Sequence, residues 1–270
     1  MSKFDGYLIL SDMDGTLLGD DRQISQENRE AVAYFTQNGG RFAVATGRSK
    51  AGMEYFLQDI AINAPCVICN GAVVYDFQKK EIVRAEAVGQ DGYELALDLA
   101  QRFPDAGIEV SVLDGEYVAR GSEITRRHFE YVKIPYRPMA PEEIAQPWIK
   151  LNLTMDPDKI GEMTAYIDRA YAGRFHAQHS AAYFYEILKP GATKGAGARF
   201  VCQYLGIDPD HLFVVGDGQN DVELLQSTRN CYAPENAHPD VLRLHPALLP
   251  GNNEHTIAAL IKKLDADITR

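Results

Sequence analysis

Residues 7–16 read YLILSDMDGT, and this stretch decides the fold. The apolar run from Tyr7 to Leu10 has the length and composition of a buried strand, and it stops at Ser11. Two carboxylates, Asp12 and Asp14, follow at once. In open α/β sheets, ligands bind outside the carboxyl ends of the strands, so this stretch predicts a functional site at the end of the first strand.

The next sixty residues repeat the strand-then-polar pattern. A helix is predicted over residues 25–38, with Ser25 as its N-cap and two glycines as its stop, followed by a strand over 41–45 that ends in Thr46-Gly47-Arg48. After a second helical stretch, the run PCVIC (65–69) predicts a third strand, which ends in Asn70-Gly71. This alternation implies a doubly wound parallel sheet with helices on both faces.

The pattern is interrupted and then resumes. Residues 77–188 mix helical and strand segments with a proline-rich interval, which indicates an inserted α+β lobe. From Pro190-Gly191 onward the alternation returns, with a helix predicted over 193–205 and an apolar strand over 212–215 that ends in GDGQND. We therefore expect a core formed by residues 1–76 and 189–270, with residues 77–188 inserted as a second domain.

Length, composition and net charge exclude some classes of function and favour others. The chain has 270 residues, of which 46% are hydrophobic, and a formal net charge of -11. The size predicts two modest lobes, and the negative charge opposes binding to nucleic acid or to anionic membranes. We find no signal segment and no apolar run long enough for a membrane span, so we expect a soluble cytoplasmic protein. Its oligomeric state is left open.

Four cysteines include the C-x-x-C of Cys66 and Cys69. This spacing can indicate a redox or zinc site. Here it lies in an expected strand, where residues three apart point to opposite faces, so we expect buried free thiols instead.

Asp12 and Asp14 stand two residues apart and could point to the same side of the chain. Such close carboxylates repel unless one is protonated or a cation lies between them, and hard oxygen ligands favour Mg²⁺. A solvated acidic turn is the alternative. The other strand ends weigh against it because they add a hydroxyl at Thr46, an ammonium at Lys194 and further carboxylates, the complement that phosphoryl transfer needs.

Four motifs carry a specific resemblance: residues 12–16 (DMDGT), 45–48 (ATGR), 194–195 (KG) and 216–221 (GDGQND). Together they resemble the motifs of the haloacid dehalogenase (HAD) superfamily. The position and length of the insert are similar to those of the Cof-type subgroup with a type C2 (IIB) cap. The resemblance implies a Rossmann-like core, an inserted cap domain and a Mg²⁺-dependent phosphatase that acts on a small phosphate ester through an aspartyl-phosphate intermediate.

The same resemblance implies roles for individual residues. Asp12 is expected to be the nucleophile and Asp14 the general acid and base, while Lys194 neutralises the phosphoryl and nucleophile oxygens. The implied metal ligands are Asp12, the main-chain carbonyl of Asp14, and Asp217, with Asp221 in a supporting role. The implied phosphate or substrate contacts come from Thr46, Gly47, Arg48, Asn70 and Asn220.

Some points stay open at this stage. His255 departs from the family's pattern, which commonly has glycine there, and could reshape the rim of the site. A phosphomutase or phosphotransferase of the same superfamily is the first alternative. A phospho-aspartate signalling module resembling a response-regulator receiver is less favoured, because such modules are shorter and carry the phosphorylated aspartate on the third strand. Neither the phosphate ester nor the cap residues that select it follow from the sequence.

Overall fold

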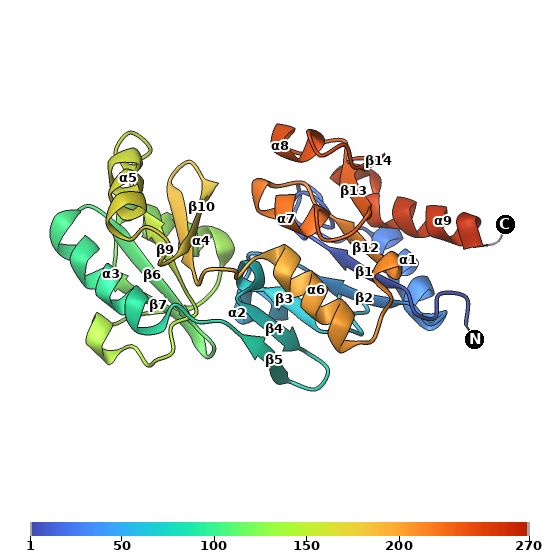
Figure 1. Cartoon of the computed structure of the whole chain (residues 1–270), viewed down its shortest axis with the longest axis horizontal. Coiled ribbons are helices and arrows are strands. Elements are labelled where there is room, and N and C mark those ends of the chain that lie inside the picture. The colour runs from blue at the N-terminus through green and yellow to red at the C-terminus, as the bar shows by residue number, and fades with distance from the viewer. Residues whose placement is uncertain (1, 269–270) are drawn as a thin grey trace. The chain divides into compact units, whose positions relative to one another are not determined.

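The computed structural model describes residues 2–268, and the chain divides into two compact units (Figure 1). The first unit is formed by residues up to 48, residues 53–84 and residues from 193 onward. The second is formed by residues 49–52 and 85–192. Both units thus consist of segments that are distant in sequence.

The first unit is built on a five-stranded sheet. Its strands are β1 (Leu8–Ser11), β2 (Arg41–Val44), β12 (Leu212–Val215), β13 (Asn230–Pro234) and β14 (Ala247–Leu249). They are all parallel, in the order β14-β13-β12-β1-β2. The strand order therefore reverses between β1 and β12. Since parallel crossovers are right-handed, this reversal places the connecting helices on both faces of the sheet, which confirms the predicted doubly wound core.

Helices of the first unit pack in two pairs. The helices are α1 (Gln26–Gln37), α6 (Lys194–Tyr204), α7 (Val222–Leu225), α8 (Pro239–Leu242) and α9 (Thr256–Ile268). A short helix, α2 (Lys50–Glu54), follows β2. α1 packs against α9, and α6 packs against α7. Both long helices predicted for this unit begin after a hydroxyl N-cap: Ser25 accepts from Asn28 N, and Thr193 accepts from Ala196 N.

A smaller sheet extends the first unit beyond the boundary expected from sequence. It consists of β3 (Cys66–Ile68), β4 (Val73–Asp76) and β5 (Glu81–Ala85), in that order. A parallel bridge between Ala45 and Val67 places β3 beside the end of β2. Because β5 joins the sheet that β3 and β4 begin, the first unit runs on to residue 84, past the expected boundary at 76.

The four cysteines are free thiols, as expected. Cys66 and Cys69 are buried, and burial raises the pKa of the Cys66 thiol to about 12. Cys69 lies outside β3, in a short 3₁₀ turn, so β3 is shorter than the strand predicted from the run PCVIC.

The second unit is a six-stranded sheet with three helices. The elements are α3 (Gly89–Arg102), β6 (Gly107–Val112), β7 (Gly115–Arg120), α4 (Glu123–Val132), β8 (Tyr136–Pro138), β9 (Lys150–Thr154), α5 (Ile160–Ala170), β10 (His176–Ala181) and β11 (Phe184–Leu188). The strand order is β10-β11-β9-β6-β7-β8, antiparallel except for β7 and β8. This is an α+β unit, as predicted.

Two kinds of buried side chain alternate along the central strands of this sheet. Apolar side chains of α3 and α5, such as Leu99 and Met163, share a buried core with Trp148 and with alternate strand residues such as Val110 and Leu151. The intervening strand positions carry buried polar groups. Lys150 Nζ donates to Glu186 at 3.2 Å, and Ser111 Oγ donates to Glu116 at 2.7 Å. Every buried charge named here has a partner, which limits its desolvation cost.

Candidate active site

The carboxyl ends of β1 and β12 lie side by side at the point where the strand order reverses. Ser11 pairs with Val215, and the backbone N–H of Asp12 donates to the carbonyl oxygen of Val215 at 2.8 Å. Asp12 therefore starts beside the loop 216–221, which contains Asp217. This reversal is the position at which open α/β sheets bind their ligands.

Lys194 joins this strand end to the third motif. It is the first residue of α6 and only 1% of its surface is exposed. Its Nζ donates to Asp12 Oδ1 at 2.6 Å and to Asp221 Oδ1 at 2.7 Å. Burial opposes the charged form, but the two carboxylates raise the pKa of Lys194 above its ordinary value. Lys194 is thus held as an ammonium between two aspartates.

Asp221 organises the loop in front of it. Its side chain is fully buried, and its Oδ2 accepts from the backbone N–H groups of Asp217 at 3.1 Å and Gly218 at 2.9 Å. Its Oδ1 accepts from Lys194. One carboxylate therefore contacts both the loop that carries Asp217 and the lysine that contacts Asp12.

Thr16 orients Asp217. The Thr16 hydroxyl donates to Asp217 Oδ1 at 2.6 Å. Burial, together with the nearby carboxylate of Asp221, raises the pKa of Asp217 to about 6 despite this hydrogen bond. Thr16 stands in the first motif but had no role in the sequence interpretation. Its position two residues after Asp14, beside a predicted metal site, is the signal that could have identified it.

The arrangement suits a divalent cation. One carboxylate oxygen from each of Asp12, Asp217 and Asp221 lies within 4.8 Å of the others. Burial and the adjacent Asp221 carboxylate raise the pKa of Asp12 well above its ordinary value. Three carboxylates face one ammonium, so a hard cation would relieve their repulsion. The residues present therefore fit a divalent metal.

Asp14 stands apart from these three carboxylates. Its side chain is 55% exposed, and both of its oxygens accept from Arg48, through Nε at 2.8 Å and Nη2 at 2.6 Å. The guanidinium also lies over the ring of Phe56, 4.9 Å from its centroid. The expected general acid is thus held by a bidentate ion pair with a residue that the sequence assigned to substrate binding.

The predicted phosphate-side residues gather at the ends of β2 and β3. Thr46 is buried, and its carbonyl oxygen accepts from the backbone N–H of Asn70 at 2.9 Å. The Asn220 amide donates to Asn70 Oδ1 at 3.0 Å. A Cβ on Gly47 would lie 3.1 Å from the Asn70 side-chain amide, so glycine permits this close approach. The structure therefore brings together Thr46, Gly47, Asn70 and Asn220.

His255 lies outside this group. It adopts a left-handed backbone conformation (φ 64°) directly before α9, a conformation that glycine reaches without strain. Its Nδ1 lies 3.5 Å from a carboxylate oxygen of Glu27, near the start of α1. His255, which departs from the family pattern, thus contacts Glu27 of α1.

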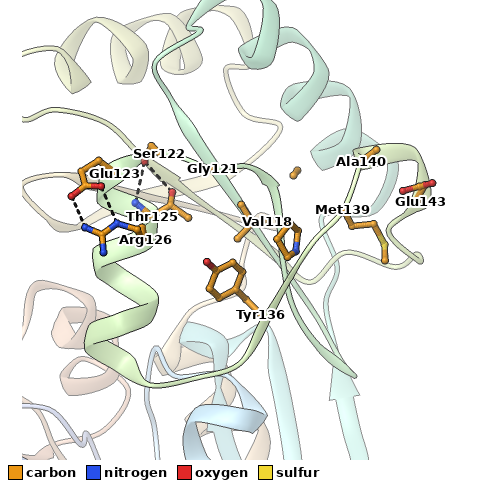
Figure 2. Close-up of a pocket in the computed structure, with 12 residues that line it drawn as sticks. Val118, Gly121, Ser122, Glu123, Thr125, Arg126, Tyr136, Met139, Ala140 and Glu143 are labelled. Atoms are coloured by element: carbon orange, nitrogen blue, oxygen red, sulfur yellow. Dashed lines mark hydrogen bonds and ion pairs between the residues drawn. The ribbon is translucent and has the colours of Figure 1, made fainter.

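The second unit carries a separate hollow with a cavity volume of about 840 Å³ (Figure 2). It is lined by β7, β8 and the start of α4. Among its lining residues, Glu123 pairs with Arg126, and Ser122 caps α4 through the backbone N–H of Thr125. Glu123 and Arg126 form an ion pair, and Glu143 is the other charged lining residue, so the hollow holds no cluster of carboxylates like the one at the strand ends.

No helix within residues 2–268 combines the length and apolar character needed to cross a membrane.

Comparison with known proteins agrees with this geometry. YxeH of Bacillus subtilis (strain 168) is 29% identical over 95% of this chain and 97% of its own length. The phosphoglycolate phosphatase of Methanopyrus kandleri is 25% identical over 95% and 96%, respectively. The HMP-PP phosphatase of Cronobacter sakazakii is 28% identical over 88% and 87%.

Solved structures share the fold. A haloacid dehalogenase-like hydrolase from Bacteroides thetaiotaomicron has a TM-score of 0.88 at 20% identity, covering 96% of this chain and 99% of that one. A HAD subclass IIB sugar phosphatase has a TM-score of 0.82 at 18% identity, covering 97% and 99%. The sequence profile of haloacid dehalogenase-like hydrolases matches residues 9–261. With this match, the predicted superfamily, fold and enzyme class are confirmed: the chain belongs to the haloacid dehalogenase-like hydrolase family.

Proposed function

We propose that this protein is a Mg²⁺-dependent phosphatase that hydrolyses a small phosphomonoester through an aspartyl-phosphate on Asp12. The observation that carries the proposal is the contact of the buried Asp12 with Lys194, beside the carboxylates of Asp217 and Asp221. A fixed ammonium and a cation site beside one carboxylate are what an attack on a phosphoryl group requires, because charge must be neutralised where it develops. The relatives named as phosphatases support the same activity.

In the first step, a carboxylate oxygen of Asp12 forms a bond to phosphorus while the bond from phosphorus to the leaving-group oxygen breaks. Asp14 gives its proton to that oxygen, and the alcohol departs. In the second step, Asp14 takes a proton from water as the water oxygen attacks phosphorus. The bond between Asp12 and phosphorus breaks, which releases inorganic phosphate and restores the carboxylate.

The chain's own groups position these steps. Lys194 neutralises the oxygen of Asp12 that it contacts, and Asp221 holds Lys194 and the loop of Asp217 in place. Mg²⁺, held by Asp12, Asp217 and the carbonyl oxygen of Asp14, would add charge neutralisation at the phosphoryl oxygens. Asp14 must separate from Arg48 before it can contact a leaving group, because both of its oxygens are engaged in the ion pair.

The division of labour between the units is part of the proposal. All of the site residues expected from sequence fall in the first unit. We assign catalysis to this unit and choice of ester to the second unit, which acts as the cap. Exchanging residues 85–192 for the corresponding segment of a relative with a different preferred ester should change the ranking of substrates. An unchanged ranking in a folded chimera would refute this assignment.

Phosphate release from a panel of sugar phosphates, nucleotides and cofactor phosphates tests the activity. The wild-type protein should hydrolyse at least one ester with Mg²⁺, lose activity in chelator and regain it when Mg²⁺ is added back. Asp12→Asn keeps the shape of the side chain and removes its nucleophilic charge, so turnover should fall by at least about a thousandfold with the fold intact. Product analysis separates hydrolysis from transfer to a sugar hydroxyl. Wild-type turnover by the Asn variant would exclude the aspartyl-phosphate route.

A further inference from the structure

The loop that follows the nucleophile is held by three asparagine side chains from distant parts of the chain. Each side-chain amide donates to a backbone carbonyl oxygen of residues 15–18. The bonds run from Asn236 to Gly15 at 2.9 Å, from Asn28 to Leu17 at 3.3 Å, and from Asn252 to Leu18 at 3.1 Å. Three carbonyl groups of this loop are therefore tied to α1, to the segment after β13 and to the segment after β14.

Asn236 and Asn252 are also bonded to each other. The Oδ1 of Asn236 accepts from the backbone N–H of Asn252 at 2.9 Å. The amide of Asn252 reaches Asp20 Oδ1 at 3.0 Å as well as the loop carbonyl. Asn252 is 7% exposed, whereas Asn236 is exposed. The pair thus forms one connected brace, with a buried and an exposed member.

The braced loop touches the metal site through Asp217. Gly15 has a positive φ of 83°, and a Cβ there would lie 2.5 Å from Asp217 Oδ2, so its backbone lies directly against that carboxylate. Thr16 donates to the other oxygen, Oδ1, at 2.6 Å. A shift of Gly15 or Thr16 would therefore turn the Asp217 carboxylate or separate it from its hydrogen-bond donor.

We infer that Asn236 and Asn252 are positioning residues for the metal site, acting through Gly15 and Thr16 on Asp217. The inference rests on the proposed function, since it assigns these residues to the site that would hold Mg²⁺. Groups that orient metal ligands affect metal affinity strongly when they are removed. Neither asparagine touches the ligands, so their effect on the metal is transmitted by the loop.

Binding of Mg²⁺ alone, measured by calorimetry on the purified protein, tests the inference without any ester. Asn236→Ala should weaken Mg²⁺ binding about tenfold, the lower end of the range for groups that orient ligands. Its unfolding temperature should change little because the side chain is exposed. Asn252→Ala should weaken Mg²⁺ binding similarly and also lower the unfolding temperature, because a buried carbonyl loses its donor.

Asn63→Ala is the matched control. Asn63 also bridges two backbone groups of the first unit, donating to Gly40 O at 2.9 Å and accepting from Phe42 N at 2.8 Å, away from residues 15–18. Its loss should lower the unfolding temperature and leave Mg²⁺ affinity unchanged.

The outcomes separate the inference from the proposed function. Wild-type Mg²⁺ affinity in a folded Asn236→Ala variant overturns the inference, even if the wild-type protein hydrolyses esters. An equal loss of Mg²⁺ affinity in Asn63→Ala also overturns it, because the effect would then follow stability. A wild-type protein that binds Mg²⁺ but hydrolyses no ester would instead refute the proposed function, while the affinities of the variants still decide the inference.

Discussion

Replacing Lys194 with methionine should lower both the stability of the first unit and its turnover. Methionine fills a similar volume without the charge, and Lys194 is 1% exposed, with Asp12 at 2.6 Å and Asp221 at 2.7 Å. Removing the ammonium leaves two buried carboxylates with no cation between them. Breaking a buried ion pair in this way costs about 3–5 kcal/mol, so Lys194→Met should lower the free energy of unfolding by about that amount in chelator.

A second substitution shows whether the stability loss in Lys194→Met comes from unpaired charge or from lost packing. In Lys194→Met/Asp221→Asn one of the two uncompensated carboxylates is gone, so we expect recovery of about half of the lost stability. Turnover should not recover, because the nucleophile still lacks its neighbouring cation. The single variant should lose at least about a hundredfold in kcat, as expected when a group that stabilises developing charge is removed.

Unfolding is followed in urea by circular dichroism for the whole chain and by tryptophan fluorescence for the second unit. Trp148, the only tryptophan, is fully buried in the core of that unit. It therefore reports on a region that the substitution does not touch. A loss below about 1 kcal/mol in the single variant, or a double variant no more stable than the single one, would refute the reasoning.

Two further predictions concern Glu116 and Arg48. Burial raises the pKa of Glu116, so the stability it contributes is complete below its ordinary value of 4.5 and is lost as pH rises through the raised value. The glutamine of Glu116→Gln does not titrate. The unfolding temperature of this variant should therefore rise relative to that of the wild type as the pH is raised from about 4 to about 8. A difference in unfolding temperature that does not depend on pH would contradict this prediction. Arg48 is expected to contact the substrate, and Arg48→Lys keeps the charge but cannot make the bidentate contact that a guanidinium makes with phosphate oxygens, so kcat/KM should fall roughly tenfold. Steady-state kinetics on the best ester measure this fall. An unchanged kcat/KM would contradict the prediction.

The sequence predicted where the candidate site lies because most of its residues directly follow buried strands. Asp12, Thr46 and Asp217 each stand within two residues of a largely apolar four-residue strand, a pattern that needs no knowledge of distant contacts. Parallel pairing then brings these ends to one edge. The doubly wound core followed from the same local pattern.

Contacts between distant segments were beyond the sequence. The ion pair between Arg48 and Asp14 depends on how two loops are placed relative to each other, so it could not be predicted from the two residue types. The asparagine brace joins residues more than 200 positions apart. The extension of the first unit to residue 84 depends on β5, a strand whose residues are largely exposed and lack an apolar alternation. Such features follow from tertiary packing, which overrides local propensity.

Both units bury acidic residues, so burial of carboxylates alone does not identify the catalytic cluster. In the second unit Glu186 accepts from Lys150 at 3.2 Å, and Glu109 contacts His128 at 2.9 Å. These carboxylates have local partners, which makes their burial compatible with a purely structural role. At the strand ends of the first unit, the carboxylates of Asp12, Asp217 and Asp221 lie close together, and Lys194 contacts two of them, Asp12 and Asp221. An uncompensated buried charge lowers stability, so a cluster of this kind is best explained by a cationic ligand that offsets it. Charge imbalance, rather than acidity, distinguishes the candidate active site from the structural carboxylates.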